Sequence, residues 1–279
     1  MFRFGRIVVA VVLASVIAGC GRAEPEESMS PEDASVVAAL GQAREMTGTF
    51  ELDVSNDGAG STFEVTVADG NYHIKPVALA EGATPGPGEL LFLADGRTLS
   101  RTGDSAWTVQ PSVQAASMGN PGAILDSFAG MRGYSPGSTE DLAGRETTRF
   151  VAEASEAEQV MKVMGLDQLE AVGGSELTEL LGQFLAETSR IEETVWVDDE
   201  GQLAQATLEL SNSAGERPEC EFLPGEITFT VTDVRVDESA VVAVPADAEV
   251  TEAPPTSAPA VPGAGQIGTM AAALQSCFK

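Results

Sequence analysis

Hydrophobic and polar residues alternate over two long stretches of the chain, residues 49–110 and 191–236. A period of two is typical of strands that have one buried face. Turn sequences such as Asp57-Gly58 and Asp69-Gly70 separate the runs and favour hairpins. The pattern predicts antiparallel strands around residues 50–54, 63–67, 72–74, 91–93, 107–109, 145–154, 191–197, 203–210 and 227–236.

Helical spacing replaces this alternation elsewhere. Ser30 and Pro31 predict the start of one helix, because serine caps helices and proline suits the first helical position. A second predicted helix begins at Pro121, and two more begin at Ser155 and Ser175. The last of these carries a continuous apolar stripe formed by Leu177, Leu180, Leu181, Phe184 and Leu185.

The order of these elements predicts an α+β fold. Helices inserted between strands of one large antiparallel sheet must cover its apolar face. A long twisted sheet tends to curl into an incomplete barrel, so we expect the helices to cover the concave face of a curved sheet. The space between sheet and helices can be filled or hollow.

The first 19 residues have the pattern of a secretory signal. Arg3 and Arg6 precede an apolar run that is shorter than the roughly 20 residues of a membrane-spanning helix. Ile17-Ala18-Gly19-Cys20 resembles the bacterial lipobox, in which the cysteine receives acyl chains such as palmitate and becomes the mature N-terminus. We therefore expect a lipid anchor at Cys20, on the extracytoplasmic face of the cell membrane. The alternative is a secreted protein with an accidental cysteine at the cleavage point.

The rest of the chain divides by composition. Residues 20–30 are a polar tether, residues 31–250 one folded domain, residues 251–265 a Pro/Ala-rich linker and residues 266–279 a short apolar segment. Once Cys20 is acylated, Cys220 and Cys277 remain, in a compartment that permits disulfides. We expect them to pair; two free thiols are the alternative.

Charge and composition exclude several classes of function. The formal charge of -28 makes binding to nucleic acid unfavourable. His73 is the only histidine, it has no predicted partner, and no nucleophile elbow, phosphate loop or cysteine–histidine pair is present. We therefore expect neither an enzyme nor a bound cofactor or metal, and assign no catalytic residue.

Two sets of charged residues can each be interpreted in two ways. Asp53, Asp57 and Glu64 match positions of a calcium-binding loop, but the flanks alternate like strands and favour a hairpin tip. Arg145 and Arg149 stand out because basic residues are scarce; either they meet a lipid headgroup or they pair with neighbouring acids.

Four segments resemble the LolA-like superfamily of bacterial lipoprotein and lipid carriers, and within it the actinobacterial LppX/LprG-type lipoproteins. They are the lipobox and residues 141–150, 195–201 and 234–245. The resemblance implies a half-barrel with helices over its concave face, and an apolar cavity for acyl chains or lipidated cargo. The Pro-rich tail and the Cys220/Cys277 pair depart from this family pattern.

The hypothesis that follows is a membrane-anchored protein that binds or carries a lipid. The expected cavity lining is Ile124, Phe128, Met161, Met164, Leu177, Leu181 and Phe184. The alternative for the methionines is ordinary core filling. The alternative for the protein is a structural or sensory lipoprotein of the cell envelope, with a filled core, that binds a protein partner. A further possibility is that residues 267–274 plug or cap the open side.

Overall fold

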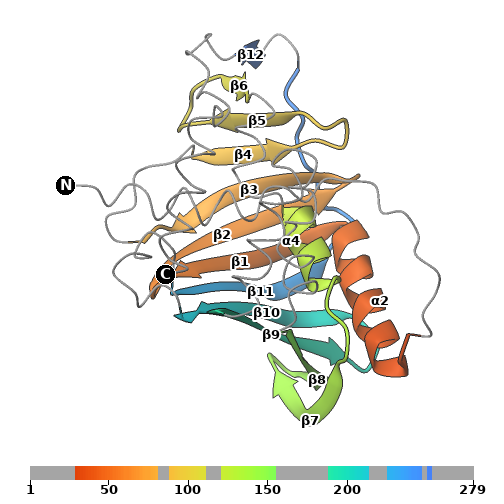
Figure 1. The fold of residues 1–279 in the computed structure, drawn as a ribbon. Coiled ribbons are helices and arrows are strands. Elements are labelled where there is room, and N and C mark those ends of the chain that lie inside the picture. Colours follow the sequence, from red (N-terminus) through yellow and green to blue (C-terminus); the bar gives the residue numbers. More distant parts are fainter. Residues whose placement is uncertain are drawn as a thin grey trace.

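One curved sheet organises the molecule. The computed structural model describes residues 29–80, 88–110, 121–154, 188–213, 225–246 and 250–252. The sheet contains twelve strands in the order β12-β6-β5-β4-β3-β2-β1-β11-β10-β9-β8-β7, as Figure 1 shows. All neighbouring pairs are antiparallel except β12 with β6. Within the described residues the outer strands β7 and β12 do not pair with each other, so the sheet is an incomplete barrel.

The strands follow the chain in two meanders that meet in the middle of the sheet. The first contains β1 (Gly48–Asn56), β2 (Ala59–Ala68), β3 (Asn71–Ala78), β4 (Glu89–Phe92), β5 (Thr98–Arg101) and β6 (Trp107–Val109). The second contains β7 (Ser135–Leu142), β8 (Arg145–Ala154), β9 (Ser189–Asp198), β10 (Leu203–Asn212) and β11 (Glu226–Val236), with β12 (Val250–Glu252) following it in the chain. The pairing of β1 with β11 joins the two meanders.

Turn chemistry explains the hairpins. Asp57 and Gly58 between β1 and β2, and Asp69 and Gly70 between β2 and β3, all have positive φ. Two successive residues with positive φ form the turn whose twist matches that of paired strands. The expected turns at these positions are therefore confirmed.

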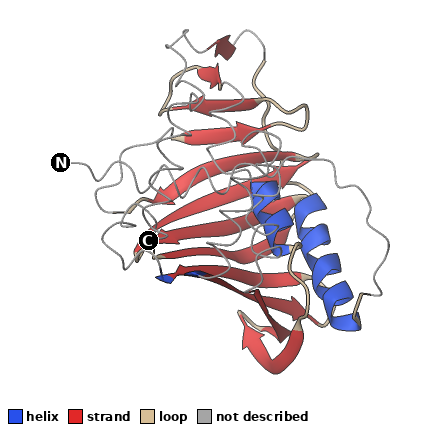
Figure 2. Ribbon diagram, in the orientation of Figure 1, coloured by secondary structure: helices blue, strands red, loops and turns tan. Residues whose placement is uncertain are grey.

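Two helices lie on the same side of the sheet (Figure 2). They are α2 (Pro31–Glu45) and α4 (Pro121–Phe128). As expected, Ser30 caps α2: its hydroxyl accepts a hydrogen bond of 3.0 Å from the amide of Asp33. Helix α2 packs against α4 and against β9 and β10. The predicted class, an α+β fold with helices over the concave face of an antiparallel sheet, is confirmed. The helices expected from Ser155 and Ser175 lie outside the described residues.

The described residues form two hydrophobic cores, one on each face of the sheet. The main core lies under the helices and includes Val36, Leu40, Phe128 and the inward side chains of the central strands. The second core lies on the opposite face, where Leu91, Leu99 and Trp107 pack with Val242. Val242 belongs to residues 237–246, which run from β11 towards β12 (blue in Figure 1).

Three strands, β5, β7 and β12, did not emerge from the sequence pattern. β5 has only one large apolar residue, Leu99, and β7 alternates no apolar residues at all. β7 is exposed along most of its length because it is an edge strand, paired only with β8 among the described residues. A strand that buries neither face leaves no periodic signal in the sequence.

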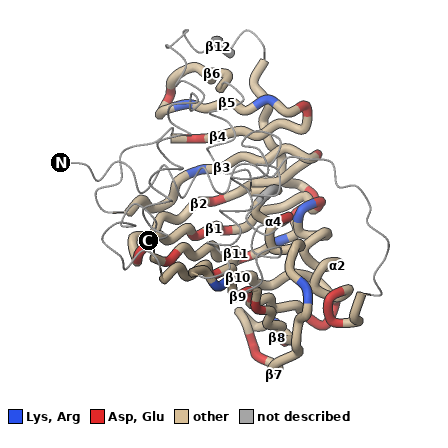
Figure 3. Tube along the Cα trace, in the orientation of Figure 1, with Lys and Arg blue, Asp and Glu red and all other residues tan. Residues whose placement is uncertain are grey.

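Acidic residues are dispersed over the fold. Figure 3 shows them in the strands, in the β7–β8 hairpin and at the start of α2. Such a distribution gives most of the surface a negative potential. The acidic residues are not gathered at a single site.

Candidate functional site: the helix-covered face of the sheet

The helix-covered face is apolar across the whole middle of the sheet. Each central strand directs its alternate residues into the main core, and cross-strand pairs such as Ala206 with Val231 and Val65 with Ile74 continue the layer. The inward residues of the five central strands include Val65, Val67, Phe50, Leu52, Ile227, Val231, Ala206, Leu208, Leu210, Ile191, Val195 and Val197. The middle of this face is therefore one continuous apolar layer.

Ile124 and Phe128, two of the expected lining residues, are placed in the main core. Ile124 is 6% exposed and Phe128 is fully buried. They occupy the inner side of α4 together with Leu125, and Met131 follows the helix into the same core. The other five expected lining residues, Met161, Met164, Leu177, Leu181 and Phe184, lie outside the described residues.

Four further hydrophobic side chains on this face are only partly buried. They are Val54, Phe63, Leu90 and Phe229. Val54 on β1 lies directly opposite Phe229 on β11, and Phe63 lies opposite Leu52, the residue two before Val54. Three neighbouring strands therefore form one apolar patch that the packing leaves partly open. Alternation predicts that these residues point inward, but it cannot show how completely they are covered.

A single acid interrupts this apolar face. Glu193 occupies an inward position of β9, and its cross-strand neighbours are Ala152 and Leu208. Its side chain is completely buried. One carboxyl oxygen lies 2.7 Å from the hydroxyl of Tyr134, and the other, Oε2, has no hydrogen-bond partner among the described residues. The sequence carries a signal for this acid, because alternation in Ile191-Glu192-Glu193-Thr194-Val195 puts Glu193 on the same face as Ile191 and Val195.

The surroundings of Glu193 favour its neutral form. Burial raises the pKa of Glu193 well above its ordinary value, and the hydrogen bond from Tyr134 opposes this only in part. The Tyr134 hydroxyl also lies 3.3 Å from the carbonyl oxygen of Phe128, at the end of α4. A hydroxyl has one proton, so a protonated Glu193 can donate to Tyr134 while Tyr134 donates to Phe128.

Tyr134 is itself fixed by the first turn of α2. The buried Asp33 accepts hydrogen bonds from the amides of Gly133 and Tyr134, at 2.9 and 3.0 Å. Burial, followed by the adjacent Glu193, raises the pKa of Tyr134 and keeps its hydroxyl protonated. Helix α2, the segment after α4 and strand β9 therefore meet in one polar network inside an apolar core.

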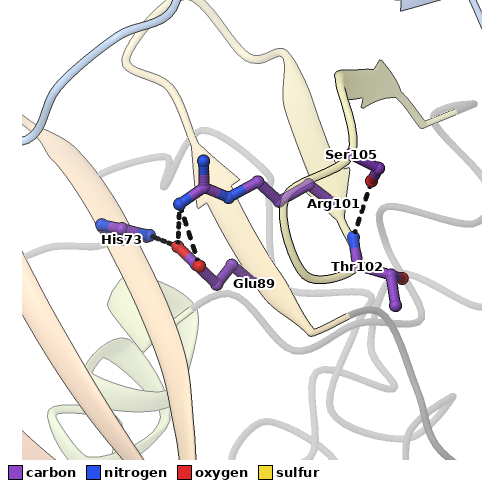
Figure 4. A network of polar contacts seen from close by, with 5 residues as sticks. All are labelled: His73, Glu89, Arg101, Thr102 and Ser105. Atoms are coloured by element: carbon purple, nitrogen blue, oxygen red, sulfur yellow. Dashed lines mark hydrogen bonds and ion pairs between the residues drawn. The ribbon is translucent and has the colours of Figure 1, made fainter.

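A second polar network lies on the opposite face, around the only histidine (Figure 4). His73 Nε2 lies 2.7 Å from a carboxylate oxygen of Glu89, and Arg101 donates to both oxygens of Glu89 at 2.9 Å. The guanidinium of Arg101 also lies 4.7 Å from the ring centre of Trp107. The expectation that His73 has no partner is therefore wrong. It failed because Glu89 is 16 residues away in the chain and reaches His73 only through the pairing of β3 with β4.

This network fastens the outer strands of the first meander. His73 is on β3, Glu89 on β4 and Arg101 on β5. After β5, the amide of Thr102 donates a hydrogen bond of 3.2 Å to the hydroxyl of Ser105. Burial lowers the pKa of His73 although Glu89 acts in the opposite direction. Burial by itself would raise the pKa of Glu89, but hydrogen bonds from Arg101 and His73 outweigh it and lower that pKa overall. Such a network stabilises strand order without supplying a nucleophile.

Arg145 and Arg149 have different partners. Arg145 lies 3.6 Å from a carboxylate oxygen of Asp198, which confirms the interpretation of pairing with a neighbouring acid. The guanidinium of Arg149 lies 5.9 Å from the ring centre of Trp196, its cross-strand neighbour on β9.

The segment that resembles a calcium loop forms the β1–β2 hairpin, as the alternation indicated. Asp53 accepts a hydrogen bond from Thr62, and Asp57 accepts two from the amides of Gly225 and Glu226, so these carboxylates serve different parts of the fold. The described residues contain no group of three side chains arranged to hold a metal ion, and none of their helices is long and apolar enough to cross a membrane. Cys20, Cys220 and Cys277 lie outside the described residues.

Comparison with known proteins yields only structural likenesses. No family model and no curated protein sequence matches the chain. The structure is similar to the lipoprotein LppX of Mycobacterium tuberculosis, at 18% identity and a TM-score of 0.39, over 74% of this chain and 98% of LppX. It is similar to LprF of Mycobacterium bovis, at 14% identity and a TM-score of 0.40, over 77% of this chain and all of LprF.

A third likeness is to MucB, solved in the MucA/MucB complex of Pseudomonas aeruginosa. The identity is 13% and the TM-score 0.35, over 78% of this chain and 65% of the other. LppX belongs to the group that the sequence resembles.

Proposed function

We propose that this protein is an extracytoplasmic lipoprotein that binds the acyl chain of a lipid between the sheet and its covering helices. The observation that carries the proposal is the partly open patch formed by Val54, Phe63 and Phe229 on the helix-covered face. Large aromatic side chains on an inward face are normally buried completely, because each gains about 1.5–3 kcal/mol from burial. An acyl chain covering the patch would supply that burial.

The proposed mechanism needs no covalent chemistry. Burial of an acyl chain contributes about 0.8 kcal/mol per methylene group, which is similar to what the same chain loses on leaving a bilayer. Transfer is therefore nearly balanced, and a preformed site is required to make it favourable. The rigid hydrogen-bonded sheet would provide such a preformed wall.

We also propose that Cys20 is the site of acylation and that the protein stays attached to the membrane. More than one acyl chain is needed for stable attachment. The full chain has a formal charge of -28, and an acidic body is repelled by an anionic bilayer, so electrostatic attraction would not contribute to the attachment. The tether at residues 20–30 would keep the body at a distance from the surface.

Native mass spectrometry of the exported body, produced without Cys20, tests lipid binding directly. We expect a bound lipid at a stoichiometry of one, identified after organic extraction. Phe229→Asn should reduce binding, because a polar side chain then interrupts the apolar patch. Thr228→Asn is the matched control, since Thr228 is the adjacent residue and points to the other face of β11. Equal binding by the two folded variants would remove the patch from the site.

Partner binding with a filled interior is the second candidate function. It is supported by the complete burial of Phe128 and the near-complete burial of Ile124 on the inner side of α4. A mass without bound lipid, unchanged after incubation with membrane lipids, would favour this candidate over the first.

A further inference from the structure

Glu193 is out of place in its surroundings. Its neighbours along β9 on the same face are Ile191 and Val195, and its cross-strand neighbours are Ala152 and Leu208, all of them apolar and buried. A leucine in this position would have continued the apolar layer with no polar atom to satisfy. The unpartnered Oε2 therefore represents an unused hydrogen-bonding capacity in the interior of the protein.

We propose that Glu193, held by Tyr134, is a hydrogen-bonding anchor for an uncharged hydroxyl group carried by the bound lipid. The inference rests on the proposed function, because it places the hydroxyl on a ligand that lies against the helix-covered face. It adds a specificity that an apolar patch cannot provide: the site would prefer hydroxylated lipids over plain acyl chains.

The arrangement of protons specifies what the anchor accepts. Tyr134 has one proton for two neighbours, Glu193 Oε1 at 2.7 Å and the carbonyl oxygen of Phe128 at 3.3 Å. When Glu193 carries a proton on Oε1, that oxygen donates to the Tyr134 hydroxyl while Tyr134 donates to Phe128, so both contacts are hydrogen bonds. Oε2 is then a carbonyl oxygen, which needs a donor. A hydroxyl supplies a donor without bringing a charge into the apolar interior, whereas an ammonium or a phosphate would do so at a large desolvation cost.

Two kinds of lipid carry a suitable hydroxyl: an acyl chain hydroxylated along its length, and a diacylglycerol with a free glycerol hydroxyl. Three probes distinguish them, namely stearate, 12-hydroxystearate and dioleoylglycerol. Their affinities for the exported body are measured by displacement of the fluorescent fatty acid parinaric acid. We expect one hydroxylated probe to bind about fivefold more tightly than stearate, since a net hydrogen bond contributes about 1 kcal/mol.

The variants separate the anchor from the apolar site. Glu193→Leu should lose the preference for a hydroxylated probe over stearate. Glu193→Gln keeps a hydrogen-bonding oxygen and should retain the preference. Glu192→Gln is the control, because Glu192 is the adjacent residue and is exposed on the outer face.

Each outcome bears on one of the two proposals. Binding of stearate without any preference for a hydroxylated probe overturns the anchor and leaves the proposed function intact. A preference that persists in Glu193→Leu also overturns the anchor. If the native protein binds neither parinaric acid nor any of the three probes, the proposed function itself fails, and the anchor fails with it.

Discussion

The pKa values of two carboxyl groups, Glu193 and Glu89, shift in opposite directions because the two groups differ in burial and in their partners. Glu193 is completely enclosed and pairs with a neutral hydroxyl, so its ionised form is disfavoured. Glu89 is 21% exposed at its side chain and receives hydrogen bonds from Arg101, so its ionised form is favoured. At the scale of single residues, the partner and the access of water decide which form of a carboxyl group the fold prefers.

Glu193 makes the folded state less stable as the pH rises. Its pKa is raised in the folded protein, so its contribution is fully present below the ordinary value of 4.5 and is lost as the pH rises towards the folded-state pKa. We expect Glu193→Leu to gain stability relative to the native protein, and to gain more at about pH 8 than at about pH 4. Urea denaturation at several pH values measures the difference in unfolding free energy between the variant and the native protein. The contributions of the other carboxylates are the same in both proteins and cancel in this difference. A difference that does not change with pH would contradict the burial argument.

His73 offers a clean titration because it is the only histidine. Burial lowers its folded-state pKa, so its neutral form stabilises the fold above the ordinary value of 6.5, and this stabilisation is lost as the pH falls below that value. We expect an NMR titration midpoint below 6.5 for the imidazole. Glu89→Gln should lower the midpoint further, because the hydrogen bond and the charge of Glu89 both raise it. A midpoint that rises in this variant would show that Glu89 acts on His73 in another way.

At the scale of elements, the fold depends on a few positions where backbones approach closely. Strand β1 joins the two meanders, and its pairing with β11 is irregular between Thr49 and Glu51. Just before this irregularity, a Cβ atom placed on Gly48 would lie 2.1 Å from the carbonyl oxygen of Arg235. Only glycine fits there without a shift of the backbone.

Replacing Gly48 and Gly41 by alanine should change the stability of the protein in opposite directions. Gly48→Ala should destabilise the protein by at least about 2 kcal/mol, because the contact involves backbone atoms of β11 that cannot move aside. Gly41→Ala in the middle of α2 meets no atom within 4 Å and should stabilise it by about 0.5–1 kcal/mol. Denaturation midpoints of the two variants provide the test. A tolerated Gly48→Ala would mean that the junction of the meanders is less tightly packed than the structure shows.

At the scale of the whole molecule, one segment contributes to the second core on the outer face. Residues 237–246 leave β11 in the middle of the sheet and place Val242 against Leu91, Leu99 and Trp107 on the other meander. The segment therefore connects the centre of the sheet with the edge formed by β6 and β12, which pair with each other. Stability of that edge should depend on a part of the chain far from it in sequence.

Adjacent valines in this segment allow a matched comparison. Val242 is 7% exposed and Val241 is 76% exposed. Val242→Asp places an unpaired charge in the second core and should destabilise the protein by about 3 kcal/mol or more, whereas Val241→Asp should change stability by less than about 0.5 kcal/mol. Urea denaturation measures both. Equal effects would show that the segment does not seal the second core.

Local signals in the sequence predicted most of the elements. Alternation located β1, β2, β3, β4, β6 and the strands from β8 to β11, and the Asp-Gly turns fixed the hairpins, because both signals depend on residues close together in the chain. The same signals failed for β7, whose side chains are exposed on an edge. They also failed for His73, whose partner depends on the pairing of β3 with β4.

The sequence alone determined the fold class, the inward face of most strands and the helix start at Ser30, since periodicity and capping are local properties of the chain. Only the tertiary structure decided what lies against those faces. Glu193 and Tyr134 are 59 residues apart, and Asp33 and Tyr134 are 101 apart, so no local pattern connects them. The partial exposure of Phe63 and Phe229 also depends on which segments pack over them. The candidate site therefore arises from strand order and burial, because these alone bring distant side chains together and exclude water.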